Sequence, residues 1–123
     1  MTVADVTPMA DGIKEEFNKR RSEGNDVVMR YAGKSVKRFY NIDSQVYDEG
    51  ALPKKTKELI GLVSSLVLRC DDCIMYHLVQ CQELGLSDQE LEEAMAIGVV
   101  IGGTITIPHH RKALLAWDEM KQN

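Results

Sequence analysis

The stretch PKKTKELIGLVSSLVLR, residues 53–69, decides the expected fold of this chain. Pro53 suits the first position of a helix, because its missing backbone N–H would have no partner there. The residues that follow are apolar on nearly every side of a helix, which indicates burial between other helices. The sequence therefore predicts a mostly apolar helix over residues 54–69, with Leu59, Ile60, Leu62, Val63, Leu66, Val67 and Leu68 as its apolar residues.

The chain downstream of this helix predicts three more helices. The first covers residues 71–84, with Gly85 as its C-terminal cap. The motif Ser87-Asp-Gln-Glu90 has the spacing of a capping box and opens a helix over residues 88–101, which Gly102-Gly103 ends. The last begins at Thr104 or Pro108 and ends near Met120. A strand over residues 99–107 is the alternative, but the glycine pair and the proline disfavour it. The pattern predicts an all-α fold, a multi-helix bundle of antiparallel neighbours.

The chain upstream of Gly50 predicts shorter helices. Ile13 and Phe17 are spaced four apart among charged residues, which indicates an amphipathic helix. In order, the expected segments are a loose tail (1–8), a helix (9–21), a break at Glu23-Gly24-Asn25, a helix (26–40), an interruption (41–43) and a short helical turn (44–49). We expect a single structural domain, in which residues 1–50 form a helical extension packed on a core of residues 51–123.

Composition excludes several classes of protein. The chain of 123 residues carries a net charge of −4, which argues against binding to nucleic acid or to an anionic membrane surface. The longest apolar run, 94–108, is shorter than the ~20 residues of a membrane span, and residues 1–5 do not resemble a signal peptide. We therefore expect a cytoplasmic protein. Its three cysteines do not suit a disulfide scaffold, and a close pair in the reducing cytosol is more often catalytic, redox-sensing or metal-binding.

The segment RCDDCIMYH, residues 69–77, holds such a pair. On a helix, Cys73 and His77 lie four apart on one face, so the imidazole can accept the thiol proton or stabilise the thiolate. Cys70 lies at the helix start, where unpaired N–H groups favour a negative sulfur. Asp71 and Asp72 stabilise the same helix end but disfavour a thiolate beside them. The spacing favours a reversible disulfide.

The segment also allows other interpretations. A c-type haem site needs the histidine directly after the second cysteine, so it is excluded. A thioredoxin site needs a βαβ unit, which the pattern lacks. A zinc site would take Cys70, Cys73, His77 and a fourth group such as Cys81. The cysteines could also be buried residues without a chemical role. Redox catalysis is the interpretation that we favour.

Four segments together resemble the alkyl hydroperoxidase D and carboxymuconolactone decarboxylase family. They are LPKKTKEL (52–59), RCDDCIMYHL (69–78), LGLS (84–87) and Gly102-Gly103, and the resemblance covers roughly residues 50–117. It implies an all-α fold, a trimeric or hexameric assembly and, in the cysteine-bearing branch, thiol-dependent reduction of hydroperoxides. It also implies that Glu58 is a proton-relay residue, that Cys70 and Cys73 are the redox pair, and that His77 is the relay histidine.

From the residues alone, Glu58 is an exposed carboxylate near a helix start. A tight hairpin near Cys70 sets His77 opposite residue 63, so contact with Glu58 needs crossed helices, a longer turn or a bridging water. Cys81 is expected to be a buried small hydrophobic residue. His109 and His110 are expected in a solvated turn at the start of the last helix, where a cation opposes the helix dipole unless an anion or carboxylate lies nearby. The alternative is that they line the site or a subunit interface.

The expected function is reduction of a hydroperoxide by Cys73, with His77 and Glu58 moving the proton. Cys70 then forms a disulfide with the oxidised Cys73, and a dithiol partner, lipoyl-type or thioredoxin-like by the resemblance, reopens it. No metal or organic cofactor is expected. One alternative is a decarboxylase of a lactone acid that uses His77, His109 or His110 as acid and base. Another is a non-catalytic oligomer that senses redox state or binds zinc.

Overall fold

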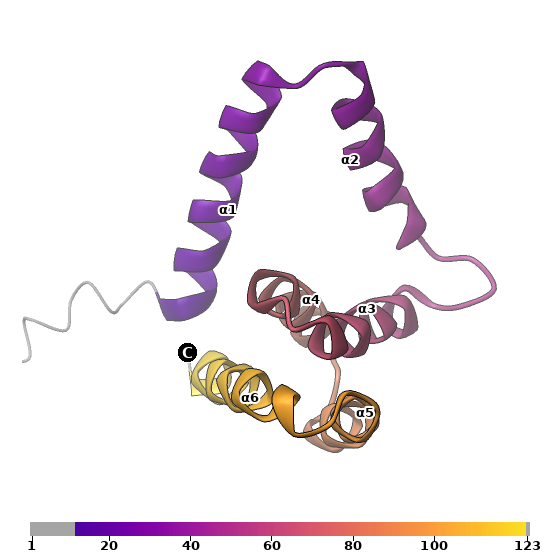
Figure 1. The fold of residues 1–123 in the computed structure, drawn as a ribbon, viewed down its shortest axis with the longest axis vertical. Helices are drawn as coiled ribbons and strands as arrows, with labels where there is room; N and C mark the ends of the chain where they lie inside the picture. The colour runs from indigo at the N-terminus through magenta and orange to yellow at the C-terminus, as the bar shows by residue number, and fades with distance from the viewer. Residues whose placement is uncertain (1–11, 123) are drawn as a thin grey trace, which may run out of the picture.

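The computed structural model describes residues 12–122, which form helices joined by short connections (Figure 1). The elements are α1 (Gly12–Tyr31), α2 (Lys34–Val46), α3 (Lys54–Leu68), α4 (Asp71–Glu83), α5 (Asp88–Gly102), the 3₁₀ turn η2 (Thr104–Thr106) and α6 (Ile107–Gln122). These residues contain no strand, so the all-α prediction is confirmed and the strand over 99–107 is wrong. The tail expected over residues 1–8 lies outside the described residues.

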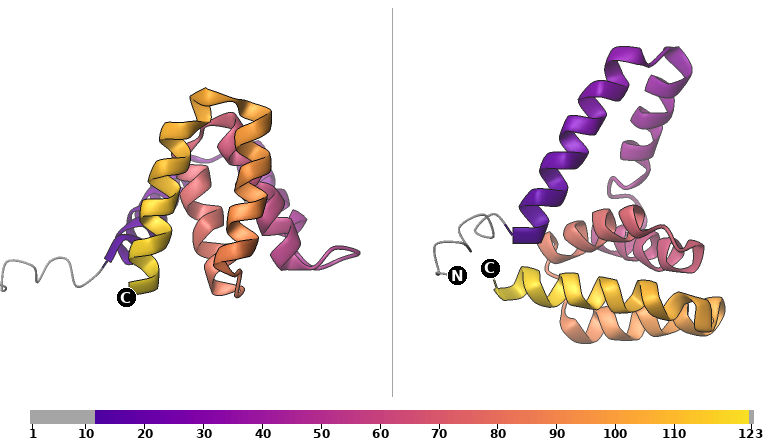
Figure 2. Two further views of the ribbon diagram at one scale, coloured as in Figure 1. Left: turned by 90° about the horizontal axis from the view of Figure 1, so that it is seen from below. Right: turned by 60° about the vertical axis from the view of Figure 1, so that its left-hand side comes forward.

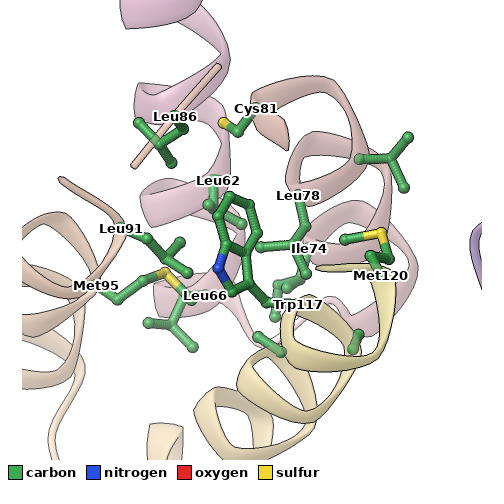
Figure 3. Close-up of a cluster of buried hydrophobic side chains, with 13 residues drawn as sticks. Leu62, Leu66, Ile74, Leu78, Cys81, Leu86, Leu91, Met95, Trp117 and Met120 are labelled. Atoms are coloured by element: carbon green, nitrogen blue, oxygen red, sulfur yellow. The ribbon is translucent and has the colours of Figure 1, made fainter. Parts of the chain in front are cut away.

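Helices α3 to α6 share one apolar core. Helix α3 packs against α4 and α5, and α6 also packs against both of these helices. Figure 3 shows the indole of Trp117, from α6, among side chains of α3, α4 and α5. Its Nε1–H donates to Asp88 at 2.8 Å, so the one polar atom of the ring has a partner. The buried apolar residues are Leu62, Leu66, Ile74, Leu78, Val79, Cys81, Leu86, Leu91, Met95, Ala113, Ala116, Trp117 and Met120.

Helix α3 matches the prediction in position but is buried on one face. Pro53 is its N-cap, one position before the expected one. The buried stripe repeats every three to four residues, as expected for a helix that faces a core. By contrast, Ile60 is 52% exposed and Leu68 75% exposed, because no other helix of the described chain covers that side. The buried stripe consists of Glu58, Gly61, Leu62, Ser65 and Leu66.

Only two residues connect α3 to α4. Arg69 adopts the left-handed conformation (φ 60°, ψ 41°), and its N–H bonds to carbonyls of the last turn of α3. Cys70 follows directly as the N-cap of α4. Such a short connection makes the two helices antiparallel neighbours. Helix α4 therefore runs back along α3 and packs against its buried face.

Helix α5 begins and ends as the sequence predicts. The Ser87 hydroxyl accepts from the N–H of Glu90 at 3.0 Å, and the Glu90 carboxylate accepts from the N–H of Ser87 at 2.9 Å, so the capping box is confirmed. Gly98 lies against α3, where an added Cβ would be 2.9 Å from Leu66. Gly103 has a φ of +81° and ends the helix. The β-branched run over residues 99–107 is not a strand. It is divided among the end of α5, the turn η2 and the first residue of α6.

The predicted boundaries upstream of residue 50 are wrong. Helix α1 continues through Glu23-Gly24-Asn25, and the break lies instead at Ala32-Gly33. A single glycine costs a helix about 1 kcal/mol relative to alanine, which its neighbours outweigh here. Helix α2 likewise continues through residues 41–43 to Val46, so the separate turn over 44–49 is its last turn.

Helices α1 and α2 extend away from the bundle as a pair (Figures 1 and 2). Helix α1 contacts the bundle near its N-terminus, where the N–H of Ile13 donates to Glu119 of α6 at 2.9 Å and Lys14 pairs with Glu83 of α4 at 3.0 Å. Helix α2 has no buried residue, and its exposed apolar side chains are Val36, Phe39, Tyr40, Ile42 and Val46. Among the helices of residues 12–122, none combines the length and the apolar character needed to cross a membrane.

Candidate active site

The two cysteines of the motif lie at the start of α4 and form a disulfide. Their Cα atoms are 5.2 Å apart, as the i, i+3 spacing allows at a helix start. The backbone N–H of Cys73 donates to the sulfur of Cys70 at 3.3 Å, so Cys70 acts as a sulfur cap of the helix. Cys73 is exposed and Cys70 is half-buried. The arrangement leaves the Cys73 side of the pair open to a reactant.

His77 and Glu58 are in direct contact one helix turn further along. The Nδ1–H of His77 donates to the Oε1 of Glu58 at 2.8 Å, and both side chains are buried, at 8% and 0% exposure. The second carboxyl oxygen faces the ammonium of Lys54 at 3.4 Å. The expectation of an exposed Glu58 is therefore wrong, because the carboxyl group points from α3 into the interface with α4. No bridging water is needed at this distance.

Gly61 explains why the contact is direct. The ring of His77 lies against Gly61, where an added Cβ would be 2.7 Å from the ring. The tight hairpin was expected to set His77 opposite residue 63, so the observed register differs by two residues. Glu58 lies three residues before Gly61 on the same helix face, and its long side chain reaches the ring. The absence of a side chain at position 61 lets the two helices approach.

We expect Gly61→Ala to displace the His77 ring. A methyl group in a filled interface forces side chains or backbone to shift, which lowers the free energy of unfolding by about 1–3 kcal/mol. Urea unfolding measures this loss. The matched control is Gly24→Ala in α1, where nothing lies within 4 Å of the added Cβ. That control should stabilise the protein by up to about 1 kcal/mol. Equal urea midpoints for wild type and Gly61→Ala would show that the interface adapts without cost.

Tyr47 is a member of the site that sequence reasoning missed. Its hydroxyl lies 3.5 Å from the Nε2 of His77, and the two ring centroids are 5.2 Å apart. Burial, followed by the negative charges of Asp43 and Glu58, raises the pKa of Tyr47 above its ordinary value. The hydroxyl thus stays protonated at neutral pH and can donate to the imidazole. Tyr47 lies at the end of α2, thirty residues before His77, and no local pattern marks it.

A cavity of about 610 Å³ lies between α1, α2 and α4. Cys73 and His77 both line it, so the sulfur of Cys73 and the imidazole of His77 face the same space. Both ring nitrogens of His77 have other partners, Glu58 and Tyr47, and no hydrogen bond joins the ring to Cys73 in the described chain. The structure thus brings the four expected residues together as two pairs, Cys70–Cys73 and Glu58–His77. One member of each pair, Cys73 and His77, lines this cavity.

The remaining candidates lie outside this cavity. Cys81 is fully buried in the core, as expected, and burial, followed by the charge of Glu58, raises the pKa of its thiol to about 12. His109 is not in a solvated turn: its Nδ1–H donates to Asp71 at 2.7 Å. This bond, together with Lys112, lowers the pKa of Asp71. His110, next in the chain, is half-buried.

The zinc site suggested for Cys70, Cys73, His77 and Cys81 is not formed. Within residues 12–122, no three His, Cys, Asp or Glu side chains lie close enough together to hold a metal ion.

Comparison with known families gives one clear match. The sequence pattern of the carboxymuconolactone decarboxylase family covers residues 34–117, from the start of α2 into α6. The chain belongs to this family. The match includes all four expected site residues and Tyr47.

Two curated relatives match about two thirds of the chain, and both are described as uncharacterised proteins. One, from Cupriavidus necator, is 29% identical over 82 residues, which are 67% of this chain and 73% of the relative. The other is a protein of the cox locus of Paracoccus denitrificans, 30% identical over 82 residues, which are 67% of this chain and 74% of the relative.

Solved structures support the same family. A crystal structure from Thermotoga maritima is 50% identical, with a TM-score of 0.86, and the match covers 88% of this chain and 95% of that one. A second Thermotoga structure, 51% identical with a TM-score of 0.84 and coverage of 87% and 91%, is described as a carboxymuconolactone decarboxylase family protein with a suggested part in the antioxidative response. A family member from Legionella pneumophila is 25% identical, with a TM-score of 0.77 and coverage of 86% and 95%.

Proposed function

We propose that this protein is a thiol-dependent peroxidase of the alkyl hydroperoxidase D type, which reduces hydroperoxides through the Cys70–Cys73 pair. The observation that carries the proposal is a disulfide at a helix start whose exposed Cys73 shares a cavity with His77, a histidine held by a buried carboxyl group. The suggested antioxidative role of the similar Thermotoga protein agrees with this activity.

Proton transfer begins the reaction of the reduced enzyme. Because the Nδ1–H of His77 donates to Glu58, the neutral ring carries its free lone pair on Nε2. The Tyr47 hydroxyl is only loosely bonded to Nε2, at 3.5 Å, and can give way to the thiol of Cys73. Nε2 accepts the thiol proton, and Glu58 stabilises the imidazolium that forms. The product is the Cys73 thiolate, which is the nucleophilic form of cysteine.

The thiolate then attacks the terminal oxygen of the hydroperoxide. A sulfur–oxygen bond forms, the oxygen–oxygen bond breaks, and the leaving alkoxide takes the proton from His77 to become an alcohol. Cys73 is now a sulfenic acid. The thiol of Cys70 attacks this sulfur, a disulfide forms, and water leaves. The two electrons that reduce the peroxide thus come from the two sulfurs.

A dithiol must reopen the disulfide. One of its sulfurs attacks the pair to form a mixed disulfide, and its second sulfur releases the enzyme as a dithiol while the partner becomes a disulfide. We propose a lipoyl- or thioredoxin-like protein as this reductant, because either presents two thiols that can reach an exposed sulfur. The open position of Cys73 supports such an exchange.

We also propose a homo-oligomer. The apolar side chains of α2 stay exposed within the described chain, and α5 exposes a further group, Ile97, Val100 and Ile101. Covering these two faces with a second copy removes apolar surface from water. A sedimentation experiment that finds only monomer at micromolar concentration would contradict this assembly.

The activity is tested by stopped-flow consumption of tert-butyl hydroperoxide, with thiols counted before and after. We expect two thiols to disappear for each peroxide consumed. Cys81 should remain a thiol and react only after unfolding, because burial raises its pKa to about 12. Consumption that continues after Cys70 and Cys73 are alkylated would reject the proposal. Turnover of a lactone acid by the alkylated protein would favour the decarboxylase alternative instead.

A further inference from the structure

The wall of the active-site cavity that belongs to α1 carries two arginines. Arg20 and Arg21 line the same cavity as Cys73 and His77. Among residues 12–122, no carboxylate lies within ion-pair distance of either guanidinium. The proposed peroxidase reaction gives neither arginine a role. Both side chains are exposed, so their guanidinium groups are open to a ligand in the cavity.

Arg21 is held in place beside the reacting groups. Its guanidinium lies over the ring of Tyr76, 4.1 Å from the centroid, where a cation is attracted to the face of the ring. Tyr76 in turn packs edge-on against His77, with centroids 5.2 Å apart. A stacked guanidinium keeps the N–H groups of its edge available to a second partner. Arg21 is thus positioned one aromatic ring away from His77.

The charges of the cavity are separated between its walls. Asp43 comes from α2 and Asp72 from α4, next to Cys73, whereas both arginines come from α1. An anionic group on a substrate is repelled from the wall that carries the sulfur and attracted to the wall that carries the arginines. A substrate with an anion at one end and a hydroperoxide at the other is therefore turned with its peroxide toward Cys73.

We propose that the cavity binds hydroperoxides that carry a carboxylate, and that Arg21, assisted by Arg20, is the carboxylate-binding residue. This inference rests on the proposed peroxidase function and specifies its substrate class. Guanidinium and carboxylate match as a pair with two parallel hydrogen bonds, which an ammonium does not reproduce. The carboxylate takes no part in the chemistry: the oxygen–oxygen bond breaks and the electrons come from the two sulfurs as above.

The test compares two substrates that differ only at the carboxyl group. These are 4-hydroperoxy-4-methylpentanoate and its neutral methyl ester, both tertiary hydroperoxides. We expect wild type to prefer the acid in kcat/KM by about tenfold, the value of one charge-assisted contact. Arg21→Gln should remove most of this preference, and Arg21→Lys should keep part of it. The matched control, Arg30→Gln, changes an exposed arginine of the same helix outside the cavity and should keep the preference.

A binding measurement separates this inference from the reaction. Calorimetry with 4-methylpentanoate, which has no peroxide, should show binding to the disulfide form of wild type and at least about tenfold weaker binding to Arg21→Gln. Reduction of both hydroperoxides with equal kcat/KM would overturn the inference and leave the peroxidase proposal standing. Binding of 4-methylpentanoate without reduction of either hydroperoxide would overturn the peroxidase proposal and retain the carboxylate site.

Discussion

Cys73→Ser is expected to lower the second-order rate constant for hydroperoxide reduction by on the order of a thousandfold or more. A serine hydroxyl is not ionised at neutral pH and cannot replace a thiolate as the nucleophile. Because Cys73 is exposed and only lines the cavity, the substitution should leave the fold intact. Stopped-flow peroxide consumption measures the rate, and circular dichroism confirms the fold.

Cys70→Ser distinguishes the roles of the two cysteines. This variant should consume one peroxide at close to the normal rate and then stop, because the sulfenic acid on Cys73 has no thiol to condense with. Mass spectrometry should find the added oxygen on Cys73. Cys81→Ala is the control and should keep the peroxide kinetics, since Cys81 lies in the core. If Cys70→Ser loses the first turnover and Cys73→Ser retains it, the order of the two sulfurs is reversed.

Glu58→Gln is expected to lower kcat/KM by about a hundredfold, in the range of general acid–base catalysis. The amide oxygen can still accept the Nδ1–H of His77, so the 2.8 Å contact and its packing are preserved. In the proposed reaction, the imidazolium that forms then lacks the neighbouring negative charge of Glu58. The measurement is kcat/KM against pH, together with urea unfolding.

Two comparisons define the role of Glu58. Glu83→Gln removes an exposed carboxylate of α4 that pairs with Lys14, and it should leave kcat/KM unchanged. Tyr47→Phe removes the weaker contact of His77, at 3.5 Å, and should cost less than Glu58→Gln. If Glu58→Gln lowers the stability but keeps full activity per folded molecule, Glu58 has a structural role only.

Much of the bundle could be predicted because its signals are local. The capping box of Ser87 and Glu90 involves residues three apart, and it starts α5 where expected. The glycines at 85 and 103 have positive φ and mark helix ends for the same local reason. The predicted break at residues 23–25 of α1 is wrong because this helix has no buried residue, so no core-facing pattern in the sequence outweighs the glycine at position 24.

The sequence by itself determined the helical pattern and the C-x-x-C-x₃-H spacing, which set the cysteine pair at a helix start and the histidine one turn later. Only the tertiary structure decided that Glu58 reaches His77, that Tyr47 lies on the other side of the ring and that Arg21 stacks near them. The physical reason is that helix periodicity extends over a few residues and determines faces. The register between two helices depends instead on how closely they pack, and here it depends on the missing side chain of Gly61.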